Sequence, residues 1–155
     1  MTKLAPQEIR TFFISSRTAA SAPIFRRQDL AELFVQVILE NKKQGRMLVH
    51  EFVIMHDHFH ALLTPAYGHP LEKCMQFLKG GFSFRAKREL GFQSDVWQAG
   101  FNEHRVKDSD EYVHHAEYIR RNPVKAGYVL NPADYRFCSA HARFTLDPPP
   151  EHLLG

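Results

Sequence analysis

Apolar and polar positions along the chain recur with two periods, and these periods predict the order of its elements. A period of two over short runs is typical of strands, and a period of 3.6 is typical of helices. Strands are expected at residues 9–15, 46–55, 58–64 and 96–106. Helices are expected from 29 to about 44, from 70 to about 85, and from 108 to about 121. This order predicts an α+β fold, a ferredoxin-like βαββαβ sandwich with one antiparallel sheet and an additional C-terminal helix.

Glycine and proline positions suggest where these elements end or bend. Gly45 is a natural stop for the first helix, and Gly80-Gly81 predict a kink or a close backbone approach in the second. Asn122-Pro123 predict the end of the third helix, because the residue before a proline is pushed out of the helical region. The prolines at 148–150 indicate a flexible tail, so we expect a catalytic domain at 1–145 and a tail at 146–155.

Two histidines share one face of the third expected strand. Side chains alternate between the faces of a strand, so His58 and His60 point one way and Phe59 points into the core. Two imidazoles side by side can share a divalent metal ion. With ten histidines in 155 residues, a pair at this spacing is also compatible with chance, and a metal site needs a further ligand.

The last expected helix presents a tyrosine and an asparagine away from its apolar side. That side consists of Tyr112, Val113, Ala116 and Ile119. Tyr118 falls on the polar side, and Asn122 lies one turn later on the same face. A surface tyrosine followed by a helix-ending asparagine is one interpretation. The other is a nucleophile beside an amide oxygen that completes a site with His58 and His60, a donor set that suits Mn²⁺ or Mg²⁺, with Zn²⁺ also possible.

Composition and charge narrow the class of protein. The length of 155 residues and a hydrophobic content of 44% predict one globular domain, and no apolar run approaches the roughly 20 residues that cross a membrane. The two cysteines lack CxxC spacing, and the first residues lack the apolar stretch of a signal peptide, so we expect a cytoplasmic protein. The net charge of +3 permits nucleic-acid binding without requiring it.

Several segments in order resemble the single-tyrosine HUH transposases, and most closely the REP-associated tyrosine transposases. They are residues 12–14, 23–25, 53–63, 96–101, 118–129 and 132–135. An HxH pair alone is a weak signal. HxH followed at this distance by Y-x-x-x-N-P-x-x-A-G is specific, and the resemblance spans roughly residues 8–140. The family commonly has Pro-Asn before the first histidine, whereas this chain has His56-Asp57, which alters the turn and adds a possible accessory ligand or base.

The resemblance implies a mechanism and a site. His58, His60 and Asn122 would hold Mg²⁺ or Mn²⁺, and Tyr118 would attack single-stranded DNA to form a 5′-phosphotyrosine link. The DNA is expected to form hairpins from repeats, and the protein to act as a monomer or homodimer, associated with the nucleoid when DNA is bound. Candidate DNA contacts are Arg85, Lys87, Arg88, Arg105, Arg120 and Arg121.

Two other classes of function remain open from the sequence. A metal-dependent nuclease would use His58, His60 and Asp57 to activate water, and would leave no protein joined to DNA. A non-catalytic or domesticated nucleic-acid-binding protein would keep the sheet and the basic surface and would bind DNA without metal.

Overall fold

The computed structural model describes residues 9–153, and the elements within them follow the expected order. The strands are β1 (Thr11–Arg17), β2 (Met47–Ile54), β3 (His58–Pro65) and β4 (Asn102–Val106). The helices are α1 (Gln28–Lys43), α2 (Leu71–Leu90) and α3 (Ser109–Lys125). Short 3-10 turns are η2 (Ala19–Ser21), η3 (Ile24–Arg26), η4 (Pro132–Asp134) and η5 (Glu151–Leu153).

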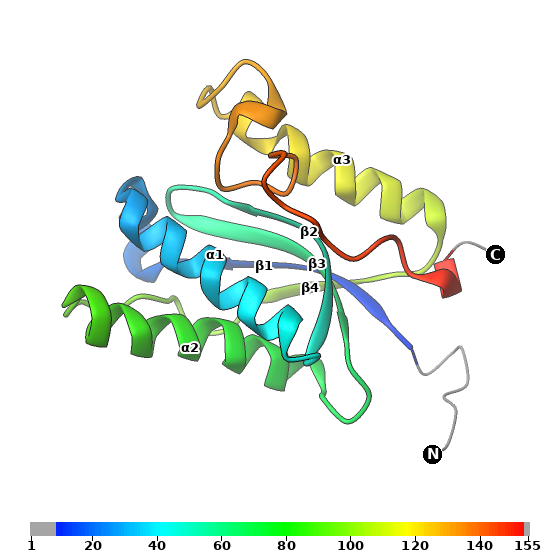
Figure 1. Ribbon diagram of the computed structural model, residues 1–155, viewed down its shortest axis with the longest axis horizontal. Coiled ribbons are helices and arrows are strands. Elements are labelled where there is room, and N and C mark those ends of the chain that lie inside the picture. The colour runs from blue at the N-terminus through cyan, green and yellow to red at the C-terminus, as the bar shows by residue number, and fades with distance from the viewer. Residues whose placement is uncertain (1–8, 154–155) are drawn as a thin grey trace.

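The strands form one antiparallel sheet in the order β2-β3-β1-β4. The helices α1 and α2 cover one face of this sheet, and α3 lies over the other (Figure 1). This arrangement confirms the expected α+β fold with an additional helix after the βαββαβ core.

An aromatic cluster fills the space between the sheet and its two covering helices. Phe34 of α1 packs edge-on against Phe59 of β3, with ring centroids 4.7 Å apart, and lies 5.1 Å from Phe82 of α2. Trp97 closes the cluster 5.5 Å from Phe59. Each fully buried phenylalanine contributes on the order of 1.5–3 kcal/mol relative to an exposed one. The cluster therefore fixes which face of β3 packs against α1 and α2.

The fourth strand is shorter than the sequence predicts. The expected strand at 96–106 is wrong over its first half, because β4 covers only Asn102–Val106. Trp97 still pairs with Thr18 through an isolated bridge. Gly100 adopts a φ of +80°, a left-handed conformation that side chains other than glycine rarely adopt, and the chain leaves the sheet there.

The last two helices are longer than the sequence predicts. α2 runs unbroken through Gly80-Gly81. A Cβ at Gly81 would lie 3.6 Å from the Val37 side chain of α1, an ordinary packing distance, so the structure does not show the expected close backbone approach there. α3 continues past Asn122 to Lys125 with Pro123 buried inside it. A proline cannot donate to the Ile119 carbonyl one turn back. The Cys138 thiol lies 3.9 Å from that carbonyl and donates to it, which compensates in part.

The segment after α3 covers the free edge of β2. Backbone amides and carbonyls join Ile54 to Phe137 and Phe52 to Ser139 at 2.9 and 2.8 Å. The Asp147 amide donates to Val49 at 3.0 Å. The described part of the expected tail, 146–153, thus lies against the sheet, while its flexibility and the domain boundary at 145 stay predictions. Residues 154–155 of that tail, and 1–8 of the expected domain, lie outside the described residues.

No helix within residues 9–153 has the length and apolar character needed to cross a membrane.

Candidate functional site

His58 and His60 lie on the face of β3 that looks toward α3. Phe59, between them, is fully buried against Phe34 on the opposite face, as the strand alternation predicts. The two imidazole rings are 4.9 Å apart between centroids and nearly perpendicular, at 79°. The histidine pair is therefore available on the α3 side of the sheet.

Asp57 sets the orientation of His58. A carboxylate only accepts hydrogen bonds, so the Nδ1–H of His58 donates to Oδ1 of Asp57 at 2.7 Å. Arg17 of β1 approaches the same carboxylate at 3.7 Å. Burial raises the pKa of Asp57, but the hydrogen bond from His58 and the positive charge of Arg17 outweigh it and hold the pKa below its usual value. With Nδ1 occupied, His58 offers the lone pair of Nε2.

His60 is buried without a hydrogen-bond partner. His60 is only 8% exposed, and neither of its ring nitrogens forms a hydrogen bond with any group in residues 9–153. Burial, together with the nearby His58 and Arg17, lowers the pKa of His60 to about 3. The ring is therefore neutral at physiological pH and holds a lone pair, which a buried polar group normally directs at a partner.

Tyr118 packs directly beside His60. Its ring lies 5.3 Å from the His60 ring at 75°, and 5.8 Å from that of Phe13. The tyrosine is 43% exposed, so its hydroxyl is accessible to a ligand on the surface. Phe13 is sandwiched between His60 and His115, with centroid distances of 5.4 and 4.4 Å. These three stacked rings connect β3, β1 and α3 next to Tyr118.

The direction of α3 follows from two ring contacts. Tyr112, near the start of the helix, lies beside His50, which is hydrogen-bonded to Thr64 near the end of β3. Tyr118, further along the helix, lies beside His60 near the start of β3. The helix therefore runs antiparallel to β3.

This direction brings Asn122 to the level of His58. Four residues of helix advance about 6 Å beyond Tyr118, and two residues of strand cover about 6.6 Å from His60 back to His58. Asn122 is half-buried. Tyr118 thus contacts His60, and by this count of rises Asn122 falls at the level of His58.

His56 does not join this group. Its ring stacks on Tyr128 with centroids 3.8 Å apart at 13°, and its backbone amide donates to the Tyr128 hydroxyl oxygen at 3.4 Å. Burial and then the charge of Arg26 lower its pKa. The structure therefore supports an accessory position for Asp57 and a packing position for His56.

The donors of His58, His60 and Asn122 fit a divalent metal ion. Two imidazole nitrogens and an amide oxygen form a mixed set of the kind that Mn²⁺ and Mg²⁺ accept. The unpaired ring of His60 is the observation that carries this fit. Among residues 9–153 no cluster of three or more His, Cys, Asp or Glu side chains could hold a metal, so a third ligand would have to come from another residue type such as Asn122.

The candidate DNA-binding residues divide between the two faces of the molecule. Three of them, Arg85, Lys87 and Arg88, lie on α2, which covers the opposite face of the sheet from α3. Arg85 is paired with Glu89 on its own helix. Arg105 is exposed on β4, and Arg121 is exposed on α3. The structure therefore does not gather them into one surface around the histidines.

Arg120 is held in an ion pair that anchors α3. Its guanidinium donates two hydrogen bonds to the Glu51 carboxylate of β2, at 3.0 and 2.6 Å. The Glu51 side chain is only 8% exposed and also accepts from Ser139 at 2.6 Å. This geometry gives Arg120 a structural position that the sequence alone did not indicate.

Residues of β1 next to the histidines were not singled out from the sequence. Phe13, Ser15 and Arg17 share the α3 face, where Ser15 is the register partner of His60 and Arg17 that of His58. The alternation of apolar and polar residues in 11–17 could have suggested a polar face. Only the pairing of β1 with β3 shows that this face borders the site.

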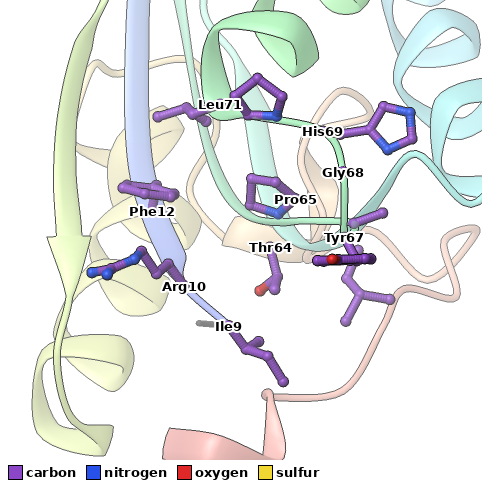
Figure 2. Close-up of a pocket in the computed structure, with 12 residues that line it drawn as sticks. Ile9, Arg10, Phe12, Thr64, Pro65, Tyr67, Gly68, His69 and Leu71 are labelled. Atoms are coloured by element: carbon purple, nitrogen blue, oxygen red, sulfur yellow. The ribbon is translucent and has the colours of Figure 1, made fainter. Parts of the chain in front are cut away.

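An apolar pocket lies at the other end of the sheet. Its volume is about 520 Å³, and Figure 2 shows Arg10 and Phe12 of the β1 end on one side and Tyr67 and His69 on the other. None of the sequence-predicted site residues lines it. The apolar pocket and the histidine pair are therefore separate features of the fold.

Comparison with known families and relatives gives consistent matches. The family model described as "Transposase IS200 like" matches residues 14–122, a range that includes both histidines, Tyr118 and Asn122. The REP-associated tyrosine transposase of Escherichia coli (strain K12) is 26% identical over 111 residues, which cover 71% of this chain and 64% of that protein. A putative REP-associated tyrosine transposase of Haemophilus influenzae is 33% identical over 84 residues, covering 54% and 44%. The chain thus matches less than two thirds of either relative.

Two solved structures resemble the fold. A REP-associated tyrosine transposase bound to a REP hairpin has a TM-score of 0.70 and 24% identity, covering 85% of this chain and 77% of that one. A putative transposase from Deinococcus radiodurans has a TM-score of 0.56 and 15% identity, covering 77% and 95%. At these identities the likeness shows a shared fold.

Proposed function

Because the chain belongs to the IS200-like transposase family, we propose that it cleaves and rejoins single-stranded DNA through a covalent bond to Tyr118. The observation that carries this proposal is the contact of an exposed tyrosine, 5.3 Å between ring centroids, with a buried histidine that lacks a hydrogen-bond partner. Tyr118 is 43% exposed, so this side of the pair borders solvent.

In the proposed site, His58, His60 and Asn122 hold Mg²⁺ or Mn²⁺. When bound, the metal ion would act as a Lewis acid toward the scissile phosphate. Asp57 keeps His58 in the tautomer that presents Nε2, because its carboxylate accepts from Nδ1 at 2.7 Å. The neutral state of His60, with a pKa of about 3, leaves its lone pair free for the same purpose.

The covalent step uses the exposed hydroxyl of Tyr118. The phenolic oxygen, having lost its proton, forms a bond to phosphorus, and the bond from phosphorus to the 3′ oxygen breaks. The products are a 5′-phosphotyrosine and a DNA strand whose 3′ oxygen takes up a proton. A second 3′-OH can then displace Tyr118 by the reverse chemistry, which rejoins strands without an external energy source.

The proposed substrate is single-stranded DNA that carries a hairpin. One structural relative is described as bound to a REP hairpin, which supports this class of DNA for the present chain. Exposed Arg121, on the same helix as Tyr118, is the proposed phosphate contact. Arg105 is the register partner of Phe12 and therefore lies on the opposite face of the sheet from the histidine pair. The protein would act on DNA in the cytoplasm as a monomer or homodimer.

The test is a covalent-adduct assay with labelled hairpins from repeats in the source genome. With Mn²⁺ or Mg²⁺, the wild-type protein should carry the label through a denaturing gel. Tyr118→Phe keeps the ring packing on His60 but removes the nucleophile, so it should abolish the adduct and retain DNA binding. Tyr67→Phe is the matched control, because Tyr67 is 76% exposed and lines the distant pocket.

Two outcomes would contradict the proposal. Strand cleavage at the wild-type rate by Tyr118→Phe would show that water is the nucleophile, as in a metal-dependent nuclease. DNA binding by the wild type with no adduct and no metal dependence would show a non-catalytic binding protein.

A further inference from the structure

The β1–β4 pairing contains an irregularity next to the site. The two strands are in register up to the pair Ser15–Asn102, and the chains pair again at Thr18–Trp97. Two residues of β1 lie between these pairs, whereas residues 98–101 supply four on the other side. The two extra residues leave the ladder as a bulge, here called the bulge loop (residues 98–101). Bulges beside active sites commonly redirect side chains.

The bulge loop is held in place by Lys79 of α2. The ammonium of Lys79 donates to the carbonyls of Gln98 and Gly100 at 3.2 and 2.6 Å. The Gln98 amide donates to the Arg17 carbonyl at 3.0 Å, and the Trp97 indole donates to the Lys79 carbonyl at 2.9 Å. These bonds define one conformation for the loop, so the side chains of Gln98 and Asn102 project from a fixed backbone.

The bulge opens a polar hollow of about 270 Å³. Its polar side chains are those of Ser15, Ser16 and Arg17 on β1, and of Gln98 and Asn102 on the opposite strand. No carboxylate is among its lining residues. Arg17 remains 55% exposed, and its contact with Asp57 is a long 3.7 Å, so its guanidinium can also bind an anion.

The hollow adjoins the proposed catalytic surface. Ser15 is the register partner of His60 on one side and of Asn102 on the other, so these three side chains form a row across the α3 face. With strands about 4.8 Å apart, Asn102 lies roughly 10 Å from His60. Arg17 stands beside His58 in the next row. A DNA strand whose phosphate lies before Tyr118 would therefore place a neighbouring nucleotide over the hollow.

We propose that this hollow binds the nucleotide next to the scissile phosphate, and that Gln98 and Asn102 read its base. This inference rests on the proposed function and adds a determinant of sequence preference to it. A carboxamide pairs a donor with an acceptor and can bond two atoms of one base edge, which gives discrimination among bases. Arg17 contacts the phosphate of that nucleotide, because a guanidinium matches two phosphate oxygens.

The experiment uses a pool of repeat hairpins in which the single-stranded flank is randomised. Covalent adducts formed by the wild type, Gln98→Ala and Asn102→Ala are isolated and sequenced. The wild type should prefer one base at a position adjacent to the cleaved bond. Each variant should reduce that preference by roughly 5–100-fold, the range expected for the loss of a bidentate base contact. Preferences at the other positions should be unchanged.

Gln76→Ala is the matched control, because Gln76 is an exposed glutamine on α2, on the opposite side of the sheet. It should keep the wild-type preference at every position. Adducts from Gln98→Ala and Asn102→Ala that show the same preference as the wild type would overturn the inference while leaving the proposed function intact.

A second measurement separates failure of the hollow from failure of the proposed function. Short single-stranded DNA is added to the ¹⁵N-labelled Tyr118→Phe protein, which needs no cleavage. Saturable shifts at Ser15, Arg17, Gln98 and Asn102 should appear and should weaken in the Asn102→Ala background. If the wild type forms no adduct, the proposed function fails, but the chemical-shift changes still show whether DNA binds in the hollow. If DNA causes no shifts at these residues, the proposal that the hollow binds a nucleotide is wrong.

Discussion

At the scale of single residues, the site depends on how each histidine ring is held. His58 has a hydrogen-bond acceptor in Asp57, whereas His60 is buried with neither ring nitrogen paired within residues 9–153. A buried imidazole without a partner is costly, and it is retained where a ligand supplies the missing contact. His58 is therefore oriented by a hydrogen bond and His60 by packing alone. A substitution at Asp57 should lower metal affinity through His58 and leave His60 in place.

Asp57→Asn tests the support of His58. The substitution keeps an oxygen acceptor but removes the charge and allows the amide to rotate, so the orientation of His58 is less defined. Loss of such a partner typically lowers metal affinity by about 10–100-fold. Calorimetric titration with Mn²⁺ measures this, with Asp95→Asn as control because Asp95 is exposed. Equal Mn²⁺ affinity in wild type and Asp57→Asn would rule out the positioning role.

Asn122 supplies the second residue-scale prediction. Asn122→Ala removes the amide oxygen and should weaken Mn²⁺ binding, whereas Asn122→Asp keeps an oxygen, adds a negative charge and should preserve it. Electron paramagnetic resonance of bound Mn²⁺ compares the two variants without requiring DNA cleavage. Unchanged Mn²⁺ binding by Asn122→Ala would exclude Asn122 as a ligand.

At the scale of elements, α3 is fastened to the sheet by the Glu51–Arg120 pair. The carboxylate is nearly buried and accepts from both Arg120 and Ser139, whereas the arginine is half-exposed. Because Tyr118 lies two residues before Arg120, this anchor also fixes the helix that carries Tyr118 against β2 and β3. The same ion pair therefore stabilises α3 on the sheet and positions Tyr118 beside His60.

Arg120→Ala should destabilise the protein by about 1–3 kcal/mol, because it leaves a buried carboxylate with one partner fewer. Arg121→Ala is the matched control on the same helix. Arg121 is exposed, and its replacement should change the free energy of unfolding by no more than about 0.5 kcal/mol. Urea unfolding of both variants makes the comparison. Equal effects of the two substitutions would show that the pair contributes nothing.

At the scale of the whole molecule, the C-terminal segment joins distant parts of the chain. Arg143 donates two hydrogen bonds to Glu32 of α1, at 2.8 and 3.1 Å, and two to the Arg136 carbonyl. The hydrogen bond from Arg143 holds the pKa of Glu32 below its ordinary value, against the opposing effect of burial. Folding stability should therefore depend on pH through this pair.

The sign follows from the lowered pKa. A carboxylate with a depressed folded-state pKa contributes stability above its unfolded-state pKa of about 4.3, and loses it as pH falls through the lower value. Glu32→Gln should therefore be less stable than wild type at pH 7, by about 1 kcal/mol, and the difference should vanish toward pH 3. Urea unfolding at several pH values tests this, with exposed Glu117→Gln as control. A difference that does not change with pH would contradict it.

Sequence patterns within single elements were enough to predict the order of the secondary-structure elements, the fold class and which side chains share a face. The periods of apolar residues predicted the elements and the fold class, and strand alternation placed His58 and His60 on one face with Phe59 buried on the other. Helical spacing set Tyr118 and Asn122 one turn apart. These relations are short-range, so they depend only on the backbone geometry of one element.

Only the tertiary structure decided how the elements face one another. The end of α3 lay beyond Pro123 because burial and a neighbouring thiol compensate for the missing amide donor. The first half of the expected strand at 96–106 became a bulge because Lys79, far along the chain, holds its carbonyls. The pairing of Arg120 with Glu51 depends on the direction of α3, and that of Ser15 and Arg17 with the histidines depends on β1 lying beside β3. Both relations join residues more than 40 positions apart, beyond the reach of patterns within one element.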